Sequence, residues 1–470
     1  MSRINTNVSS LIAQRVLRNN NNSVNSSLER LSTGLRINRG ADNPAGLIAS
    51  ENLRAEKTGI QSALDNASRA TNIVGTAEGG LNEVSSLLNE LQGLVGTTAN
   101  TAGLSSEEIN ANQLQVDSIL STVNRLAQAT AFQGKKLLDG SLDYTTANVT
   151  TTDIDAFKVN SAKLVDGVDK TVLVELVTSA QVAAVNITSG AANSPFTIEV
   201  AGSLGTQQLS FGSGTSISSV RDAINAVTAA TGVSAVVSGS NLRINSNEFG
   251  AGKFVTVRAI QGNFESLTQG STATDTGRDA VVRVNGAAAE VDGLKVSFRS
   301  SDLDVEIDLT QTFNTDASST TFDITGGGAN FSLGSKVTEG DKVSLGIGSV
   351  STGSLGNNAV GFLNSLGSGG ANSLTSDNLV TSQKIVDAAI RQVSQLRGRL
   401  GAFQKFVVGS TVNNLGVALE NASAAESAIR DTDFAEETSK LTRNQILSQA
   451  ATTVLSQANS VPQQALSLLQ

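Results

Sequence analysis

An apolar stripe in the first quarter of the chain constrains the fold more than any other feature. Its residues recur at spacings of three and four without a miss, the pattern of a helix that packs along its length against other helices. At about 1.5 Å per residue, a helix from about residue 46 to 98 is roughly 80 Å long, which predicts a rod-like helical bundle. Many members are alanine, so we expect the partner helices to approach closely. The predicted rod core is Ile60, Ala63, Ala67, Ala70, Val74, Ala77, Leu81, Val84, Leu88, Leu91 and Val95.

Helical stripes also occupy both ends of the chain. Ile4, Val8 and Leu11 form one near the start. The other keeps a four-three rhythm almost to the last residue, through Leu447, Ala451, Val454, Ala458, Val461, Ala465 and Leu468, with a kink or restart expected at Pro462. Helices so poor in large apolar groups bury little surface alone. We therefore favour burial by neighbouring subunits over an internal core, with both ends folding on polymerisation.

A helix break separates the first stripe from the rod. Leu28, Leu31 and Leu35 continue the early helix, and the rod helix is expected to start at Leu47. Residues 36–46, which we call the spoke, supply turn formers between them. We predict that its glycines and Pro44 let the chain change direction while its charged residues contact neighbouring copies. The spoke residues singled out are Arg36, Arg39, Gly40, Asp42, Pro44 and Gly46.

Two further helices are expected. Ser105 offers an N-cap for one, and Ile109, Val116, Ile119, Val123 and Leu126 form its apolar face. Helical periodicity returns near residue 377, where Val386, Ala389, Val393, Leu396, Leu400, Phe403 and Val407 again step by three and four.

The middle of the chain, from about 143 to 374, has a different pattern. Short alternating runs separated by Gly, Ser, Asn and Asp predict half-buried strands at 196–200, 242–244, 254–257, 282–284, 296–298 and 303–309. Asn285-Gly286 and Asp292-Gly293 predict hairpin turns. One helix is expected at 217–230.

These elements predict an α+β fold, in which both chain ends build a long coiled-coil-like helical rod around a mainly β central insertion. We expect three domains. The predicted boundaries are 1–42 with 431–470 for an inner terminal-helix domain, 43–175 with 376–430 for the rod with a small β-hairpin region, and 176–375 for the outer β region.

Composition removes most enzyme chemistry. The chain has no Cys and no His, so thiol nucleophiles, Ser-His constellations and the usual zinc ligands are absent. We predict no catalytic residues, no cofactor and no metal. A net charge of −9 without a basic block argues against nucleic acid and anionic membranes as partners. The first residues lack the apolar run of a cleaved signal peptide, so export by another route is expected.

Several segments carry a resemblance to bacterial flagellin, the subunit of the flagellar filament. They are "LSTGLRINRGADNPAGLIAS", "LNEVSSLLNELQGLV" and "TAFQGKKLLDG" near the start, and the stretch from "NNLGVALENASAAESAIRDTDF" to the final "LSLLQ". The match covers roughly 1–140 and 377–470, and residues 196–260 resemble the flagellin IN motif. The resemblance implies a homopolymer of many copies with terminal helices innermost. It also implies export through the flagellar type III apparatus with the help of an export chaperone. New copies would be added beneath a cap protein at the tip, and hook-junction proteins would lie at the base of the filament.

The resemblance leaves alternatives open. A flagellin-like hook-filament junction protein shares the terminal features, and outside the family an extracellular coiled-coil adhesin is the fallback. In the family an innate immune receptor contacts a helical patch that falls on Glu90, Leu94 and Gln115. The family uses an arginine, a leucine and a glutamate at these three positions. Leu94 matches, but Glu90 has the opposite charge to the arginine and Gln115 lacks the charge of the glutamate, so we expect weak recognition. The zinc protease that some flagellins carry needs histidines and is excluded here.

Overall fold

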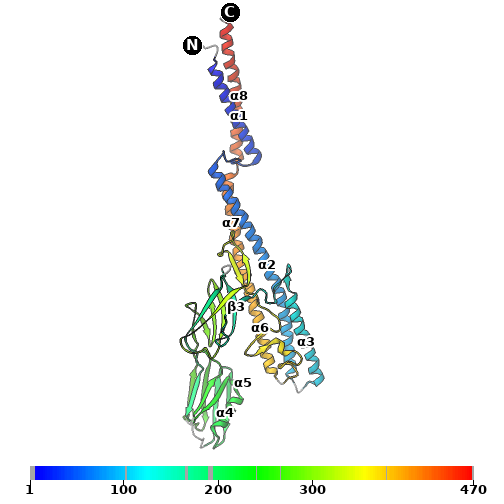
Figure 1. Cartoon of the computed structure of the whole chain (residues 1–470), viewed down its shortest axis with the longest axis vertical. Coiled ribbons are helices and arrows are strands. Elements are labelled where there is room, and N and C mark those ends of the chain that lie inside the picture. Colours follow the sequence, from blue (N-terminus) through cyan, green and yellow to red (C-terminus); the bar gives the residue numbers. More distant parts are fainter. Residues whose placement is uncertain are drawn as a thin grey trace. The chain divides into compact units, whose positions relative to one another are not determined.

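The computed structural model describes residues 6–100, 103–164, 168–188, 194–239, 241–264, 266–376 and 378–467, with side chains through 461. The chain divides into two compact units, each described by itself. The first contains residues 1–69, 332–341 and 406–470, and the second contains 70–331 and 342–405. Helix α2 (Pro44–Thr98) contributes to both. The architecture is α+β, as the sequence predicts (Figure 1).

Four helices make up most of the first unit. Besides the start of α2 they are α1 (Val8–Thr33), α7 (Gly409–Arg430) and α8 (Phe434–Ser467). Local caps explain where three of them begin. The Asn7 side chain accepts a hydrogen bond from the Ser10 N–H, Asn43 from the Gly46 N–H, and Asp433 from the Ala435 and Glu436 N–H groups.

Two helix boundaries differ from the sequence prediction. Helix α2 begins at Pro44, so Pro44 and Gly46 lie in its first turn rather than in the linker. Proline suits this place because the first-turn N–H has no partner within the helix. Helix α8 continues through Pro462 without the predicted restart.

The helical part of the second unit consists of the rest of α2, α3 (Ser106–Ala129) and α6 (Leu379–Ala402). Ser105 and Glu108 form a reciprocal capping box at the start of α3. Gln92 of α2 donates a hydrogen bond to Asp387 of α6 at 2.9 Å. A short 3₁₀ helix, η1 (Leu363–Leu366), lies against α3, where Gln113 donates to the Leu366 carbonyl.

The predicted insertion contains two β-sandwiches, each with its own core. In the first, a five-stranded and a four-stranded antiparallel sheet enclose Val172, Val305 and Phe322. Their strands, in spatial order, are β14 (Ala287–Ala288), β13 (Val281–Val284), β5 (Lys170–Thr178), β18 (Ser318–Gly327) and β3 (Tyr144–Ala147), then β15 (Glu290–Asp292), β16 (Lys295–Arg299), β17 (Leu303–Leu309) and β4 (Ile154–Ala162).

The second sandwich is built from a three-stranded and a four-stranded sheet with helix α4 (Ile217–Ala226), around Phe196, Ile198 and Ile244. The strands are β6 (Ala184–Thr188), β10 (Asn241–Ser246) and β9 (Val233–Ser238), then β12 (Thr272–Thr276), β11 (Phe254–Gln261), β7 (Phe196–Gly202) and β8 (Gly205–Phe211). The single helix predicted at 217–230 is interrupted at Val227 and followed by a four-residue turn of helix, α5 (Thr228–Thr231).

The six predicted strands are present, and the predicted turns join strands. Asn285 and Gly286 both have positive φ, of 50° and 81°, between β13 and β14, as a type I′ turn requires. Three further pairs of short strands complete the set among the described residues. They are β1 (Ala131–Phe132) with β2 (Lys135–Lys136), β19 (Ala329–Ser332) with β20 (Lys342–Leu345), and β21 (Gly356–Asn357) with β22 (Gly361–Phe362).

A turn of π-helix, η2 (Phe403–Val408), separates α6 from α7 and shifts the apolar stripe. The sequence predicts Val407 as the next buried residue after Phe403. The π turn adds one residue to the repeat, so Val408 is buried and Val407 is only half-buried.

This register shift is testable with two adjacent variants. We expect Val408→Ala to lower the free energy of unfolding by about 2 kcal/mol, because it removes buried apolar surface, and Val407→Ala to lower it by less than half as much. Urea unfolding of the full chain, followed by far-UV circular dichroism, measures both. A larger loss for Val407→Ala would contradict the shift.

Candidate assembly surfaces and helix junction

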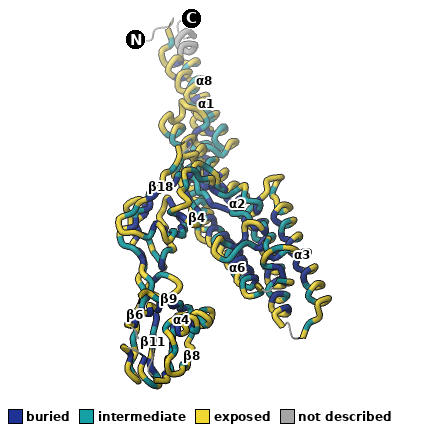
Figure 2. Tube along the Cα trace, turned by 60° about the horizontal axis from the view of Figure 1, so that its bottom comes forward, coloured by how far each residue is buried: buried dark blue, intermediate teal, exposed yellow. Residues whose placement is uncertain are grey.

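The chain itself buries the apolar stripe of α2. Ile60, Val74, Leu81, Leu88, Leu91 and Val95 are each at most 2% exposed, as are the alanines and Val84 between them. In Figure 2 this dark-blue band follows α2 and α6. Small side chains in the stripe permit the close approach that the helical bundle requires. The rod stripe therefore leaves no large apolar surface for a neighbouring copy on this face.

Helices α1 and α8 pair antiparallel through polar contacts. The Asn7 amide donates to the Ala458 carbonyl at 2.8 Å and the Asn20 amide to the Leu447 carbonyl at 3.0 Å. Ser448 donates to the Asn21 side chain at 2.7 Å. The buried residues of the pair are small or polar, namely Ser10, Ala13, Ser27, Glu437 and Ala451.

Many large apolar side chains of the same pair are exposed, while others are half-buried. Leu11 is 57% exposed and Val454 is 58% exposed, and Figure 2 shows mostly yellow and teal along both helices. Leu447, Val454 and Val461 follow one another at heptad spacing, which places them along one face of α8. The half-buried set is Leu17, Val24, Leu31, Leu441 and Leu455. The exposed set is Val8, Leu11, Ile12, Val16, Leu28, Phe434, Ile446, Leu447, Val454 and Val461; Ile4 and Leu468 lie outside the described residues.

The spoke makes its polar contacts within the chain. Helix α1 ends at Gly34, whose φ of 71° gives the left-handed turn that glycine favours. The Arg36 guanidinium donates to the carbonyls of Ala428 and Ile429, the last turn of α7. Arg39 pairs with Glu29 of α1 at 2.9 Å. The sequence prediction that these charges contact neighbouring copies stays a prediction.

Asp42 holds the turn of the spoke. Its carboxylate accepts the Arg39 N–H at 2.8 Å and the Asn38 N–H at 3.0 Å. These two N–H groups lower the pKa of Asp42 below its ordinary value of 3.8. Because the folded-state pKa is depressed, the contribution of this turn to stability is present above the ordinary aspartate pKa and is lost as the pH falls below it.

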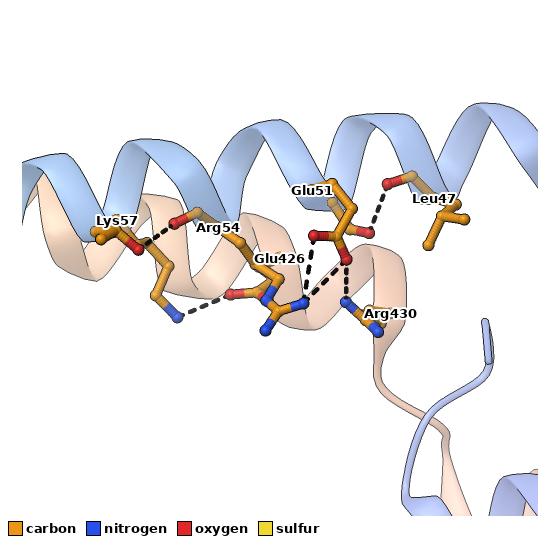
Figure 3. Close-up of polar contacts among 8 residues, drawn as sticks. Leu47, Glu51, Arg54, Lys57, Glu426 and Arg430 are labelled. Carbon is orange, nitrogen blue, oxygen red and sulfur yellow. Dashed lines mark hydrogen bonds and ion pairs between the residues drawn. The ribbon is translucent and has the colours of Figure 1, made fainter. Parts of the chain in front are cut away.

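A ladder of alternating charges joins α2 to α7 directly beside the spoke (Figure 3). Arg430 donates to Glu51 at 2.9 Å, Glu51 accepts from Arg54 at 3.0 Å, and Lys57 bonds Glu426 at 2.8 Å. Arg54 lies 3.8 Å from Glu426 and so connects the two halves. The Arg54 hydrogen bond, followed by that of Arg430, lowers the pKa of Glu51.

Sequence reasoning missed this ladder. Its only local signal is charge at spacings of three on α2 and of four on α7, which places each set on one helix face. Nothing in the sequence pairs those two faces, which lie more than 300 residues apart.

The receptor-like patch lies on α2 and α3. Glu90 and Gln115 are exposed, and Leu94 is half-buried. Among the described residues, no group of three or more Asp and Glu side chains is arranged to hold a metal ion. No helix in the described part of the chain combines the length and apolar content that crossing a membrane requires.

Comparison with known proteins identifies this arrangement. Residues 4–143 match the bacterial flagellin N-terminal helical region, 383–469 the bacterial flagellin C-terminal helical region, and 195–248 the flagellin hook IN motif. Flagellin B of Vibrio cholerae serotype O1 is 30% identical over 472 residues, covering 99% of both chains. The chain belongs to the flagellin family.

A second curated flagellin matches over nearly the whole of both chains. Flagellin D of Vibrio anguillarum is 29% identical over 469 residues and also covers 99% of both chains. A solved structure of FliC from Burkholderia pseudomallei covers 72% of this chain and 99% of that one, at 15% identity and a TM-score of 0.25.

The function follows from membership of this family. This flagellin is a structural, non-enzymatic subunit that polymerises into the extracellular filament of the bacterial flagellum. The adhesin and hook-junction alternatives are therefore set aside. The IN motif lies within the second sandwich, since residues 195–248 span β7 through β10, while β6, β11 and β12 of the same sandwich fall outside it.

The spoke of this flagellin is tightly packed at Gly46. A Cβ at this position would lie 2.7 Å from Cδ1 of the buried Ile37 and 2.8 Å from Nδ2 of Asn43. We expect Gly46→Ala to destabilise the spoke by about 1–2 kcal/mol through overpacking. Faster amide exchange at the Leu47 N–H, which bonds the Asn43 carbonyl, measures the effect.

Gly40→Ala is the matched control. Its Cβ would meet Leu47 Cδ2 at 3.7 Å, an ordinary contact, so exchange should stay unchanged. Equal effects of the two variants would contradict this account of the spoke.

Proposed function

We propose that the outward apolar faces of α1 and α8 are the surfaces through which neighbouring copies pack in the filament. The observation that supports this is the α1–α8 pair itself, whose fully buried residues are small or polar while many of its large apolar groups remain exposed. Burial of a valine or leucine side chain contributes about 1.5–3 kcal/mol, so such a face favours association once copies meet. A contact whose rotation does not close on itself generates an open helical polymer. The residues assigned to this role are Ile4, Val8, Leu11, Leu447, Val454, Val461 and Leu468.

The same imbalance supports folding on assembly. A two-helix pair without a large apolar interior gains little stability by itself. The terminal helices of the free subunit therefore order fully only when neighbours cover their outer faces.

The layered organisation remains part of the proposal. Residues 1–42 with 431–470 form the inner filament layer, 43–175 with 376–430 the rod layer, and 176–375 the outer region. The second sandwich lies within the outer region, whereas the first takes β3, β4 and most of β5 from segment 43–175. Each sandwich has a core of its own, which suits segments that need no neighbour to fold. Contacts from Arg36, Arg39 and Asp42 to other copies belong to this proposal.

Other partner proteins are expected to cover the exposed apolar groups of α1 and α8 during export and at the ends of the filament. Before assembly an export chaperone shields the terminal helices, and the export apparatus passes the chain outward. At the two ends of the polymer, the cap and hook-junction proteins take the place of a missing copy.

The proposal is tested by placing a charge on the outer face of α8. Val454→Asp should abolish filament formation at concentrations where the unchanged chain assembles, because a buried carboxylate without a partner is strongly unfavourable. The side chain is 58% exposed in the free chain, so thermal unfolding of the free subunit should not change. Sedimentation of filaments after seeding measures the effect.

Thr453→Asp is the control for this experiment. Thr453 is polar, exposed and adjacent, but lies off the heptad stripe. We expect its filaments to form with at most a small increase in critical concentration. Normal assembly of Val454→Asp would overturn the assignment of this face.

Host recognition is a second, weaker activity of the patch at Glu90, Leu94 and Gln115. We expect poor activation of the innate receptor in a reporter-cell assay, because two of the three positions lack the side chains that the family uses. Restoring them by Glu90→Arg with Gln115→Glu should raise activation at least about tenfold, the effect of roughly 1.4 kcal/mol in binding. The same change at the exposed Glu83, as Glu83→Arg, is the control. If the double variant activates the receptor no better than the unchanged chain, the assignment of the receptor patch to these three positions is wrong.

A further inference from the structure

The two helix breaks of the first unit are joined to each other. Leu35 and Asp431 form an isolated antiparallel bridge. The Arg36 N–H donates to the Arg430 carbonyl at 2.7 Å, and the Thr432 N–H donates to the Gly34 carbonyl at 2.9 Å. The end of α1 and the start of α8 are thus fixed at one shared point, which we call the clamp (residues 34–36 and 430–432).

Arg36 caps α7 from the other end of the chain. The last carbonyls of a helix have no partner inside it, and a cation there also interacts favourably with the helix dipole. One Nη of Arg36 reaches both the Ile429 carbonyl, at 2.7 Å, and the Ala428 carbonyl, at 3.2 Å. Arg430, the cation in the last turn of α7 itself, is directed to Glu51 instead. The Asp431 N–H caps the Ser427 carbonyl from within the C-terminal segment, but the side-chain cap on the Ala428 and Ile429 carbonyls comes from the N-terminal segment.

The C-terminal segment is held only partly by its own contacts. The Asp431 N–H donates to the Ser427 carbonyl at 2.9 Å, and the Ser427 hydroxyl donates to the Asp431 carboxylate at 2.6 Å. Within the described residues, Arg430 Nε, Thr432 Oγ1 and Glu437 Oε1 are buried without a hydrogen-bond partner, and such atoms destabilise a structure. The bonds with residues 34–36 therefore add favourable contacts to a segment that leaves several polar atoms unsatisfied.

We propose that Arg36 is a positioning residue that sets the boundary of order in the free subunit. By capping α7 it holds both chain breaks together before assembly. Helices α1 and α8 then extend from one fixed point and become ordered as a pair when a filament end covers them. This inference rests on the assembly role proposed above for α1 and α8.

Amide exchange on the full-length free subunit tests the clamp without any filament. In the unchanged chain, the Arg36 and Thr432 N–H groups should exchange at least about tenfold more slowly than those of residues 12–20 and 447–455. Arg36→Met should abolish that difference. Arg36→Lys keeps the charge but loses the planar fork, so it should restore part of the protection.

The control is Arg39→Met. The Arg39 side chain is 73% exposed and pairs with Glu29 at the surface, so its loss should leave exchange at Thr432 unchanged. Tyr144 provides a check on folding elsewhere, since it is the only tyrosine, the chain has no tryptophan, and it lies in the core of the first sandwich. Its fluorescence should report the same melting temperature in all four proteins.

Assembly gives the second measurement. The critical concentration for filament growth should rise about tenfold for Arg36→Met and less for Arg36→Lys. Fast exchange at Arg36 and Thr432 in the unchanged subunit would overturn the inference. It is also overturned if Arg36→Met changes assembly but not exchange, which would mean that Arg36 acts between copies. Failure of the unchanged chain to polymerise would instead contradict the proposed assembly faces, while the exchange result still decides the clamp.

Discussion

The apolar stripe of α2 is the interaction on which the other elements depend. Its members, from Ile60 to Val95, are mostly alanine in the first half and mostly leucine and valine in the second, and they are almost completely buried within one chain. A long helix of this kind is stable only when something covers its full length, because helical propensity contributes little over so many residues. The chain supplies that cover from its own later segments, and so the rod needs no neighbour to exist.

The terminal helices follow the opposite principle. Their mutual interface contains Ser10, Ala13 and Ala451, while Leu11 and Val454 face outward. The same chain therefore combines a part whose apolar stripe is buried with a part that exposes many large apolar groups. Under the proposed assembly role, the second part becomes fully ordered only when neighbouring copies cover it.

The β insertion is joined to the helical part by contacts such as the hydrogen bond from Arg399 of α6 to Asn160 of β4. Each sandwich encloses its own apolar cluster, and the chain enters and leaves this region between α3 and α6. A region with its own hydrophobic core can be inserted into the chain without changing how the helices pack. This explains why strands and turns with a period of two interrupt two long stretches of helical periodicity.

The sequence by itself determined the features that repeat over short distances. The stripes of α2 and α8, the six strands, the Asn285-Gly286 turn and the N-cap at Ser105 all follow from local periodicity and side-chain chemistry. The lack of His and Cys excludes most enzyme chemistry from composition alone, because the usual general bases, thiol nucleophiles and zinc ligands are missing. Assembly into a filament was inferred from the resemblance of both ends to flagellin, because the periodicity alone does not indicate it.

Tertiary structure decided whatever depends on pairing distant segments. The α7 partners of Glu51 and Arg36 carry no local signature, because they lie more than 300 residues away. The π turn that buries Val408 also went unpredicted. The start of α2 at Pro44 is by contrast a local feature, set by the Asn43 cap and by proline in the first turn. The α1–α8 pair belongs to the same class as the partners of Glu51 and Arg36. Its stripes are visible in the sequence, but only the paired helices show which residues are buried between them and which large apolar groups stay exposed.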